Sequence, residues 1–283
     1  MLLVVAAVGG GLLACGQHSD EPEPSVHAPT AGYPATTSRL ELSLGGQFEK
    51  LCHATLVDAS WALTAAHCFS GVAPDGRGAL EGFERNVSAQ SVEFYPGAHR
   101  SGATRRDAVW ESAEFVAAHD LALIPMSPPI EDIEPVSLWA PKADCSLVTD
   151  TRQLLGRFGQ LGAGDRAQTA EAAIMGLVAA AELLGPEHSG LLLSARGAPV
   201  GPGDSGSGLT ADQAALEAAA PECEMLVSTG NDQVLVGVIQ DAKPDLSTLP
   251  FGVVPIYIRE HAAWVAKVIQ AKPLLRDPPR LDP

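Results

Sequence analysis

The chain is poor in basic residues. It has 18 Lys and Arg against 34 Asp and Glu in 283 residues, which gives a formal net charge of −16. Nucleic-acid binding depends on basic patches that neutralise phosphates, so this balance argues against a nucleic-acid partner. The acidic excess is typical of a solvated surface; the alternative is an electrostatic preference for basic substrates.

Cysteine is also scarce, and its spacing does not favour a zinc site. The five cysteines include no C-x2-C pair, and His53 beside Cys52 is poorly spaced for a shared metal. The sequence therefore predicts no metal site.

The N-terminal apolar run, residues 2–14, is too short to span a membrane and is typical of an export signal. It ends in Leu-Leu-Ala-Cys, which resembles the bacterial lipoprotein box, although no Lys or Arg precedes it. The resemblance implies acylation of Cys15, a signal segment over 1–15, a proline-rich tether over 16–37 and a lipid anchor in the cell envelope. A plain secretory signal and a misplaced start codon are the alternatives.

Many glycines and prolines (28 and 22) separate short apolar runs, which favours an all-β body over a helical bundle. Residues 71–85, rich in glycine and charge, predict a surface loop, and the alanine-rich 167–185 suit a helix on propensity alone. Another alanine-rich run, 211–220, predicts a surface loop or short helix, and 259–271 an amphipathic helix. The expected strands are 39–44, 52–57, 61–64, 91–95, 114–116, 121–125 and 234–239.

Three segments carry residues suited to nucleophilic catalysis. Ser205 lies in a glycine-flanked loop, His67 follows an apolar run, and Asp120 begins another apolar run. A serine hydroxyl needs an adjacent base, usually an imidazole held by a carboxylate. Asp107 and Asp132 are the alternative acids nearest in sequence, but neither precedes a Leu-Ala-Leu run. The order His, Asp, Ser is that of the chymotrypsin architecture.

These motifs resemble those of the trypsin/chymotrypsin-like serine endopeptidases, over about residues 30–270. His119 stands where Asn is usual, and Ser207 where a second glycine is common. The matching segments are Leu63–Cys68, Asp120–Leu123, Gly203–Gly206 and Trp264–Val265.

The resemblance implies an all-β fold of two antiparallel six-stranded β-barrels with a C-terminal helix, and strand and loop rather than helix over 167–185. The implied protease domain covers 38–272. Its parts are barrel 1 (about 38–127), a crossover (about 128–153), barrel 2 (about 154–258) and the helix (about 259–271), before a tail over 273–283.

The resemblance also assigns roles. Ser205 is the nucleophile, His67 the general base and Asp120 its orienting acid, while the N–H groups of Gly203 and Ser205 bind the oxyanion. The implied reaction is peptide hydrolysis through an acyl-enzyme, with a protein or peptide substrate and no cofactor. The alternative is a catalytically silent or zymogen-like homologue that acts as a binding or regulatory module.

Export places the cysteines in an oxidising compartment. With Cys15 lipid-modified, four cysteines remain, and the sequence alone allows three pairings or free buried thiols. The resemblance implies a Cys52–Cys68 bridge. It leaves Cys145–Cys223, which is similar to a second bridge of the family.

The chain departs from the family around Asp204. In many members this acid pairs with a new N-terminal ammonium, after an Ile-Val-Gly-Gly-like start that follows a basic residue. Here the corresponding segment is Thr-Ala-Gly-Tyr (30–33), with no basic residue before it. Pairing of Asp204 with a side chain, or activity without cleavage, are the alternatives.

The specificity pocket also departs from the pattern of trypsin-like enzymes. Pro199 stands where these enzymes carry an acid, and Gly201 where a cysteine is expected. Asp241 or Asp245 could supply an acidic pocket wall, or could lie in a surface loop. The preferred side chain is not predicted.

Overall fold

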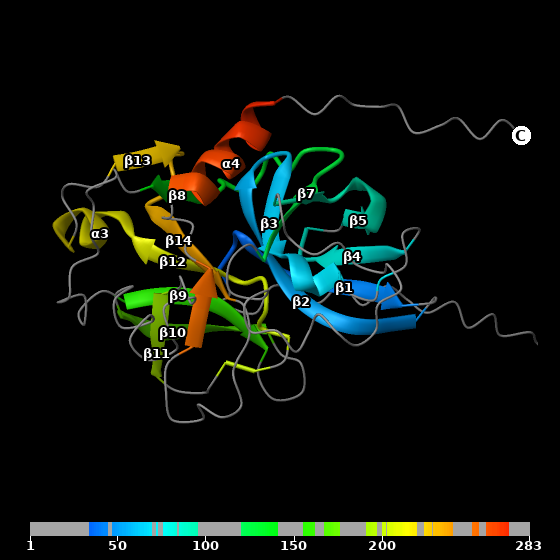
Figure 1. Cartoon of the computed structure of the whole chain (residues 1–283), viewed down its shortest axis with the longest axis horizontal. Helices are drawn as coiled ribbons and strands as arrows, with labels where there is room; N and C mark the ends of the chain where they lie inside the picture. Colours follow the sequence, from blue (N-terminus) through cyan, green and yellow to red (C-terminus); the bar gives the residue numbers. More distant parts are fainter. Residues whose placement is uncertain are drawn as a thin grey trace, which may run out of the picture.

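The computed structural model describes residues 34–44, 47–69, 72, 76–83, 85–95, 120–140, 155–161, 167–175, 191–196, 200–201, 203–219, 224–227, 229–239, 251–254 and 259–271. These residues form two β-sheets, one from each half of the chain, with one longer helix near the C-terminal end of the described chain (Figure 1). This is the predicted chymotrypsin-like architecture.

The first sheet is curled and contains seven of the described strands, in the order β5-β4-β1-β2-β3-β7-β6. In β1 the buried Leu40 and Leu42 alternate with the partly exposed Arg39 and Glu41, as a half-buried strand requires. The strands are β1 Thr37–Leu44, β2 Gln47–Asp58, β3 Trp61–Ala65, β4 Arg77–Glu81, β5 Arg85–Ser88, β6 Glu93–Phe94 and β7 Leu121–Pro125.

The second sheet closes on itself. Its described strands follow the order β12-β9-β10-β11-β15-β14-β8-β13, and an additional pairing of β12 with β14 completes a six-stranded barrel. The strands are β8 Ser137–Ala140, β9 Leu155–Leu161, β10 Ala167–Met175, β11 Leu191–Arg196, β12 Gly208–Asp212, β13 Glu224–Val227, β14 Gln233–Ile239 and β15 Phe251–Val254. β8 pairs in parallel with β14 and so extends this sheet outside the ring.

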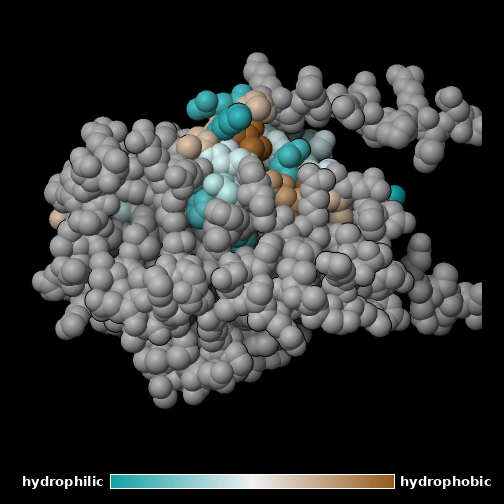
Figure 2. All heavy atoms as spheres, viewed as in Figure 1, coloured by the Kyte–Doolittle hydropathy of each residue, from teal (hydrophilic) through white to brown (hydrophobic). Residues whose placement is uncertain are grey.

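The predicted C-terminal helix is α4, Arg259–Gln270. Its buried Ala262 and Val265 join the main hydrophobic core, and Tyr95 from the first half contacts the rings of His261 and Trp264 edge-on. Where α4 lies, hydrophilic and hydrophobic described residues are adjacent on the visible surface (Figure 2). The shorter helices are η1 Ala66–Phe69, η2 Ala89–Ser91 and α3 Gln213–Ala219. Across the described residues, no helix has the length and apolar character needed to cross a membrane.

The prediction of a surface loop over residues 71–85 is wrong for residues 77–81 and 85, which belong to strands, while residues 71, 73–75 and 84 lie outside the described part of the chain. Strand β4 pairs with β1 on one side and with β5 on the other, and a short turn connects β4 to β5. Glycine and charge therefore do not indicate a loop here. A Cβ on Gly78 would lie 2.6 Å from the carbonyl oxygen of Glu41, and the charged Arg39 pairs with Glu81 across the strands. Both features therefore suit a strand with a close neighbour.

Two further segments differ from their local signals. The alanine-rich residues 167–175 form β10, because β9 and β11 pair with it on both sides. The segment interpreted as a crossover, residues 128–153, contributes β8 to the second sheet. Propensity is weak where two neighbouring strands can satisfy the backbone.

Candidate active site

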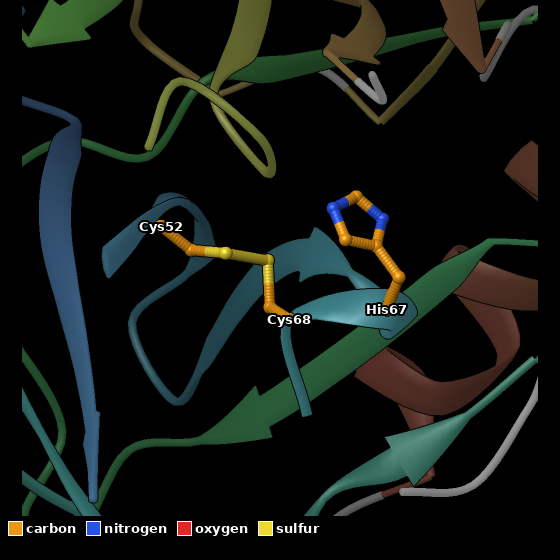
Figure 3. Close-up of side chains that lie close together, drawn as sticks. All are labelled: Cys52, His67 and Cys68. Carbon is orange, nitrogen blue, oxygen red and sulfur yellow. A yellow bond between two sulfur atoms is a disulfide. The ribbon is translucent and has the colours of Figure 1, made fainter. Parts of the chain in front are cut away.

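His67 lies in η1, directly after the fully buried strand β3. Its neighbours Ala66, Cys68 and Phe69 are buried in the first core, whereas the His67 side chain is 15% exposed. Because the residues on either side of His67 are buried, its imidazole is directed out of the core. Figure 3 shows the imidazole and the Cys52–Cys68 disulfide leaving adjacent positions of this short helix.

Asp120 holds both the backbone and the side chain of His67. Its Oδ1 accepts the His67 main-chain N–H at 2.7 Å, and its Oδ2 lies 2.5 Å from His67 Nδ1. The register of β3 with β7 places Ala65 opposite Leu121, so the residues that extend these strands meet at one edge. Because an ionised carboxylate only accepts, the contact favours a proton on His67 Nδ1, and in the neutral ring this tautomer leaves the lone pair on Nε2. The alternative acid Asp132 is exposed, and Asp107 lies outside the described residues.

The loop that carries Ser205 is held by both sheets. The Ser205 carbonyl accepts the N–H of His53 from β2 at 2.8 Å, and the Gly206 N–H donates to Ile239 of β14 at 2.7 Å. Gly206 has φ +85°, and a Cβ there would lie 2.2 Å from the His53 carbonyl oxygen. A glycine is required at this position because of both its backbone conformation and its close neighbour.

Ser205 is close to the η1 segment through its main chain. Its carbonyl oxygen lies 3.9 Å from Cys68 Sγ, in the residue that follows His67. The structure thus brings His67 and Asp120 into hydrogen-bond contact, and the main chain of the partly exposed Ser205 lies near Cys68, the residue after His67.

His53 is a part of this site that the sequence did not indicate. It is completely buried, and its Nδ1 lies 2.7 Å from the carbonyl oxygen of Gly203, which has φ +96°. Burial lowers the pKa of His53 to about 4; the hydrogen bond to Gly203 raises it, and the charge of Arg39 lowers it further. The neutral ring therefore donates Nδ1–H and fixes the Gly203 carbonyl. The only sequence signal for this role is a histidine beside Cys52, a pattern that suggests no more than a poorly spaced metal ligand.

Asp204 is 1% exposed, and its carboxylate is bonded to residues of the second half of the chain. Its Oδ1 accepts the Leu161 N–H at 2.8 Å; its Oδ2 accepts the Gly201 N–H at 2.8 Å and Gln160 Nε2 at 3.2 Å. Burial raises the pKa of Asp204, and these three hydrogen bonds oppose the rise. Of the alternatives left by the sequence, pairing with a side chain is the one observed here.

The predicted Cys52–Cys68 disulfide is present and ties β2 to η1. Its two sulfurs and a His67 ring nitrogen lie within 4.8 Å of one another, but disulfide sulfurs are not thiolate ligands, so this group does not suit a metal. Other predicted residues lie outside the described part of the chain: Cys15, Cys145, Cys223, Pro199, Asp241 and Asp245.

The fold is that of the chymotrypsin-like proteases. Residues 30–231 match the family model described as Trypsin, and the chain belongs to the trypsin family.

Solved structures share the fold at low identity. The structure described as HL collagenase has a TM-score of 0.54 and 18% identity, covering 85% of this chain and 97% of its own. Two scabies mite inactivated protease paralogues are similar. S-D1 has a TM-score of 0.54 and 12% identity, covering 84% of this chain and 93% of its own. S-I1 has a TM-score of 0.54 and 16% identity, covering 85% of this chain and all of its own (100%). These likenesses concern the fold alone, and the fold occurs in proteins named as inactivated.

Proposed function

We propose that this chain is a serine endopeptidase in which Ser205, His67 and Asp120 act as nucleophile, general base and orienting acid. The observation that carries the proposal is the double hydrogen bond from His67 to Asp120, through the main-chain N–H and Nδ1. A structural aspartate would need only the backbone contact. The contact to Nδ1 fixes the tautomer that leaves Nε2 able to accept a proton.

In the proposed reaction, the Ser205 Oγ attacks the scissile carbonyl while its proton moves to His67 Nε2. Asp120 stabilises the imidazolium that forms, and the N–H groups of Gly203 and Ser205 bind the oxyanion. The imidazolium then protonates the leaving amine, and the C–N bond breaks to give the acyl-enzyme. Water, deprotonated by His67, hydrolyses the ester and restores Ser205.

Covalent labelling by a fluorophosphonate tests this function, because the probe reacts with an activated serine. We expect the purified protein to be labelled, and Ser205→Ala and His67→Ala to lose the label. Ser91→Ala, which changes an exposed serine, is the matched control and should label like the parent. Labelling that persists in Ser205→Ala, or a parent that is not labelled, would contradict the proposal.

The second candidate function is a silent homologue that binds its partners without cleaving them. It is favoured by the similarity to inactivated protease paralogues and by Pro199 and Gly201 at positions where trypsin-like enzymes differ. The same experiment decides between the two, since a silent homologue binds peptides but does not react with the probe.

We also propose that the protein is exported and anchored through an acylated Cys15, with Cys145 and Cys223 forming a second bridge. The support is the apolar N-terminal run with its Leu-Leu-Ala-Cys ending and the even number of remaining cysteines. Mass spectrometry of the mature N-terminus and of non-reduced peptides tests both. An unmodified Cys15 in the exported protein, or a free thiol at Cys145, would contradict them.

A further inference from the structure

The buried acid next to the nucleophile is held by neutral groups of its own barrel. Both oxygens of Asp204 are occupied, by two main-chain N–H groups and by the side-chain amide of Gln160. Gln160 is itself buried, 3% exposed. A carboxylate that accepts three such bonds is fixed in direction, and with it the residues on either side, Gly203 and Ser205.

A second glutamine orients the first. Gln168 of β10 lies opposite Gln160 of β9 in the sheet register, and its Nε2 donates to Gln160 Oε1 at 3.0 Å. Because the Gln160 carbonyl oxygen is engaged by Gln168, its NH2 group is turned toward Asp204.

The outer end of this chain of hydrogen bonds reaches the surface. Gln168 is exposed, and both glutamines line a polar pocket of about 790 Å³ that also contacts Pro34–Thr36, where the described chain begins. Gln160 therefore separates the Asp204 carboxylate from this pocket. An ammonium that approached from the pocket would have to displace the Gln160 amide first.

We propose that Gln160, oriented by Gln168, is a positioning residue that holds Asp204 and the Gly203–Ser205 loop in place, so that no N-terminal ammonium released by cleavage is needed. The inference rests on the proposed peptidase function, because it concerns the loop that carries its nucleophile. It adds a regulatory statement: the loop is formed in the uncleaved chain.

The test begins with amide hydrogen exchange of the intact protein, which does not depend on activity. Gln160→Leu removes the amide at similar size, and the exchange of segments 158–161 and 200–207 should accelerate about 10- to 100-fold, as expected on losing a hydrogen bond to a charged group. Gln233→Leu, which changes another glutamine of the same pocket, is the matched control and should leave these segments unchanged.

Gln168→Leu is the second variant and is informative if Gln160→Leu does not fold. It should accelerate exchange in the same segments by a smaller factor, because it loosens Gln160 without removing it. The positioning role would be overturned if exchange in these segments were unchanged in both variants. If Gln160→Leu does not fold, unchanged exchange in Gln168→Leu would overturn it.

Fluorophosphonate labelling then tests the consequence for the nucleophile. The labelling rate constant should fall about 10- to 100-fold in Gln160→Leu. In the parent protein, the labelling rate constant should be the same before and after limited proteolysis that cuts the chain on the N-terminal side of Pro34. A tenfold or greater acceleration on cleavage would overturn the inference. A parent that shows the expected exchange but is never labelled would refute the proposed function and support the positioning by Gln160.

Discussion

The buried His53 makes the stability of this protein depend on pH in a predictable direction. Its pKa in the folded protein is about 4, against 6.5 in an unfolded chain, because burial disfavours the charged ring and Arg39 lies opposite it in the β1–β2 pairing. Between these values the unfolded state binds more protons than the folded state. The contribution of the neutral His53 ring to the free energy of unfolding is therefore fully present above pH 6.5 and is lost as the pH falls toward 4.

The magnitude follows from the separation of the two pKa values. Each pKa unit corresponds to about 1.4 kcal/mol, so the ring should lower the free energy of unfolding by about 3 kcal/mol between pH 7 and pH 4. Asp204 has a raised pKa and contributes with the opposite sign, since its protonated form is favoured in the folded state. A comparison with a variant that lacks only the His53 titration removes this and every other contribution.

The assay is urea unfolding at pH 7 and pH 4 for the parent and for His53→Asn, whose side-chain amide can still donate to the Gly203 carbonyl. The parent should lose about 3 kcal/mol more than the variant over this interval. Equal losses in both proteins would refute the reasoning, as would an NMR titration of His53 with a pKa near 6.5.

Three further substitutions test the site and its support. Asp120→Asn keeps an acceptor for the main-chain N–H of the histidine but turns an amide toward its ring; kcat should fall about 10⁴-fold with the fold retained, and a loss below tenfold would contradict the assigned role. Gly206→Ala should destabilise the protein by at least about 2 kcal/mol, because Gly206 has a positive φ and no space for a Cβ. The control Gly201→Ala should not, because no atom lies within 4 Å of the Cβ that it would add. Equal melting temperatures of the two variants would contradict this prediction. Replacing Cys52 and Cys68 together by Ala should cost about 3 kcal/mol, measured by urea unfolding, and an unchanged midpoint would argue against a stabilising bridge.

Much of the fold was predictable because it depends on local patterns. Apolar alternation identified β1, and an apolar run ended by proline identified β7 at its observed bounds. The strands over residues 77–88 were not predicted, because the close approach of β1 requires a glycine at Gly78 and a glycine in a sequence normally indicates a turn. The alanine-rich β10 could be assigned only through the family resemblance, since its own propensity favours a helix.

The candidate site was predictable where it consists of motifs and not where it depends on sheet register. His67, Asp120 and Ser205 each belong to a recognisable segment. Gln160 and Gln168 are eight residues apart and become partners only through the β9–β10 register. His53 meets Gly203 across 150 residues of chain, and no local pattern encodes such a contact.

Strand β2 is the common support of both halves of the site. Cys52 ties it to η1, which carries the imidazole, and the next residue, His53, holds the carbonyls of Gly203 and Ser205 through its ring and its main-chain N–H. Two residues further on, Thr55 Oγ1 accepts the N–H of Gly208 at 2.8 Å. One of these contacts is covalent and the others are hydrogen bonds, but all are made by one short, buried stretch of the chain. Because that stretch cannot shift without moving both the imidazole and the loop that carries Ser205, their relative position is set by the buried core around β2.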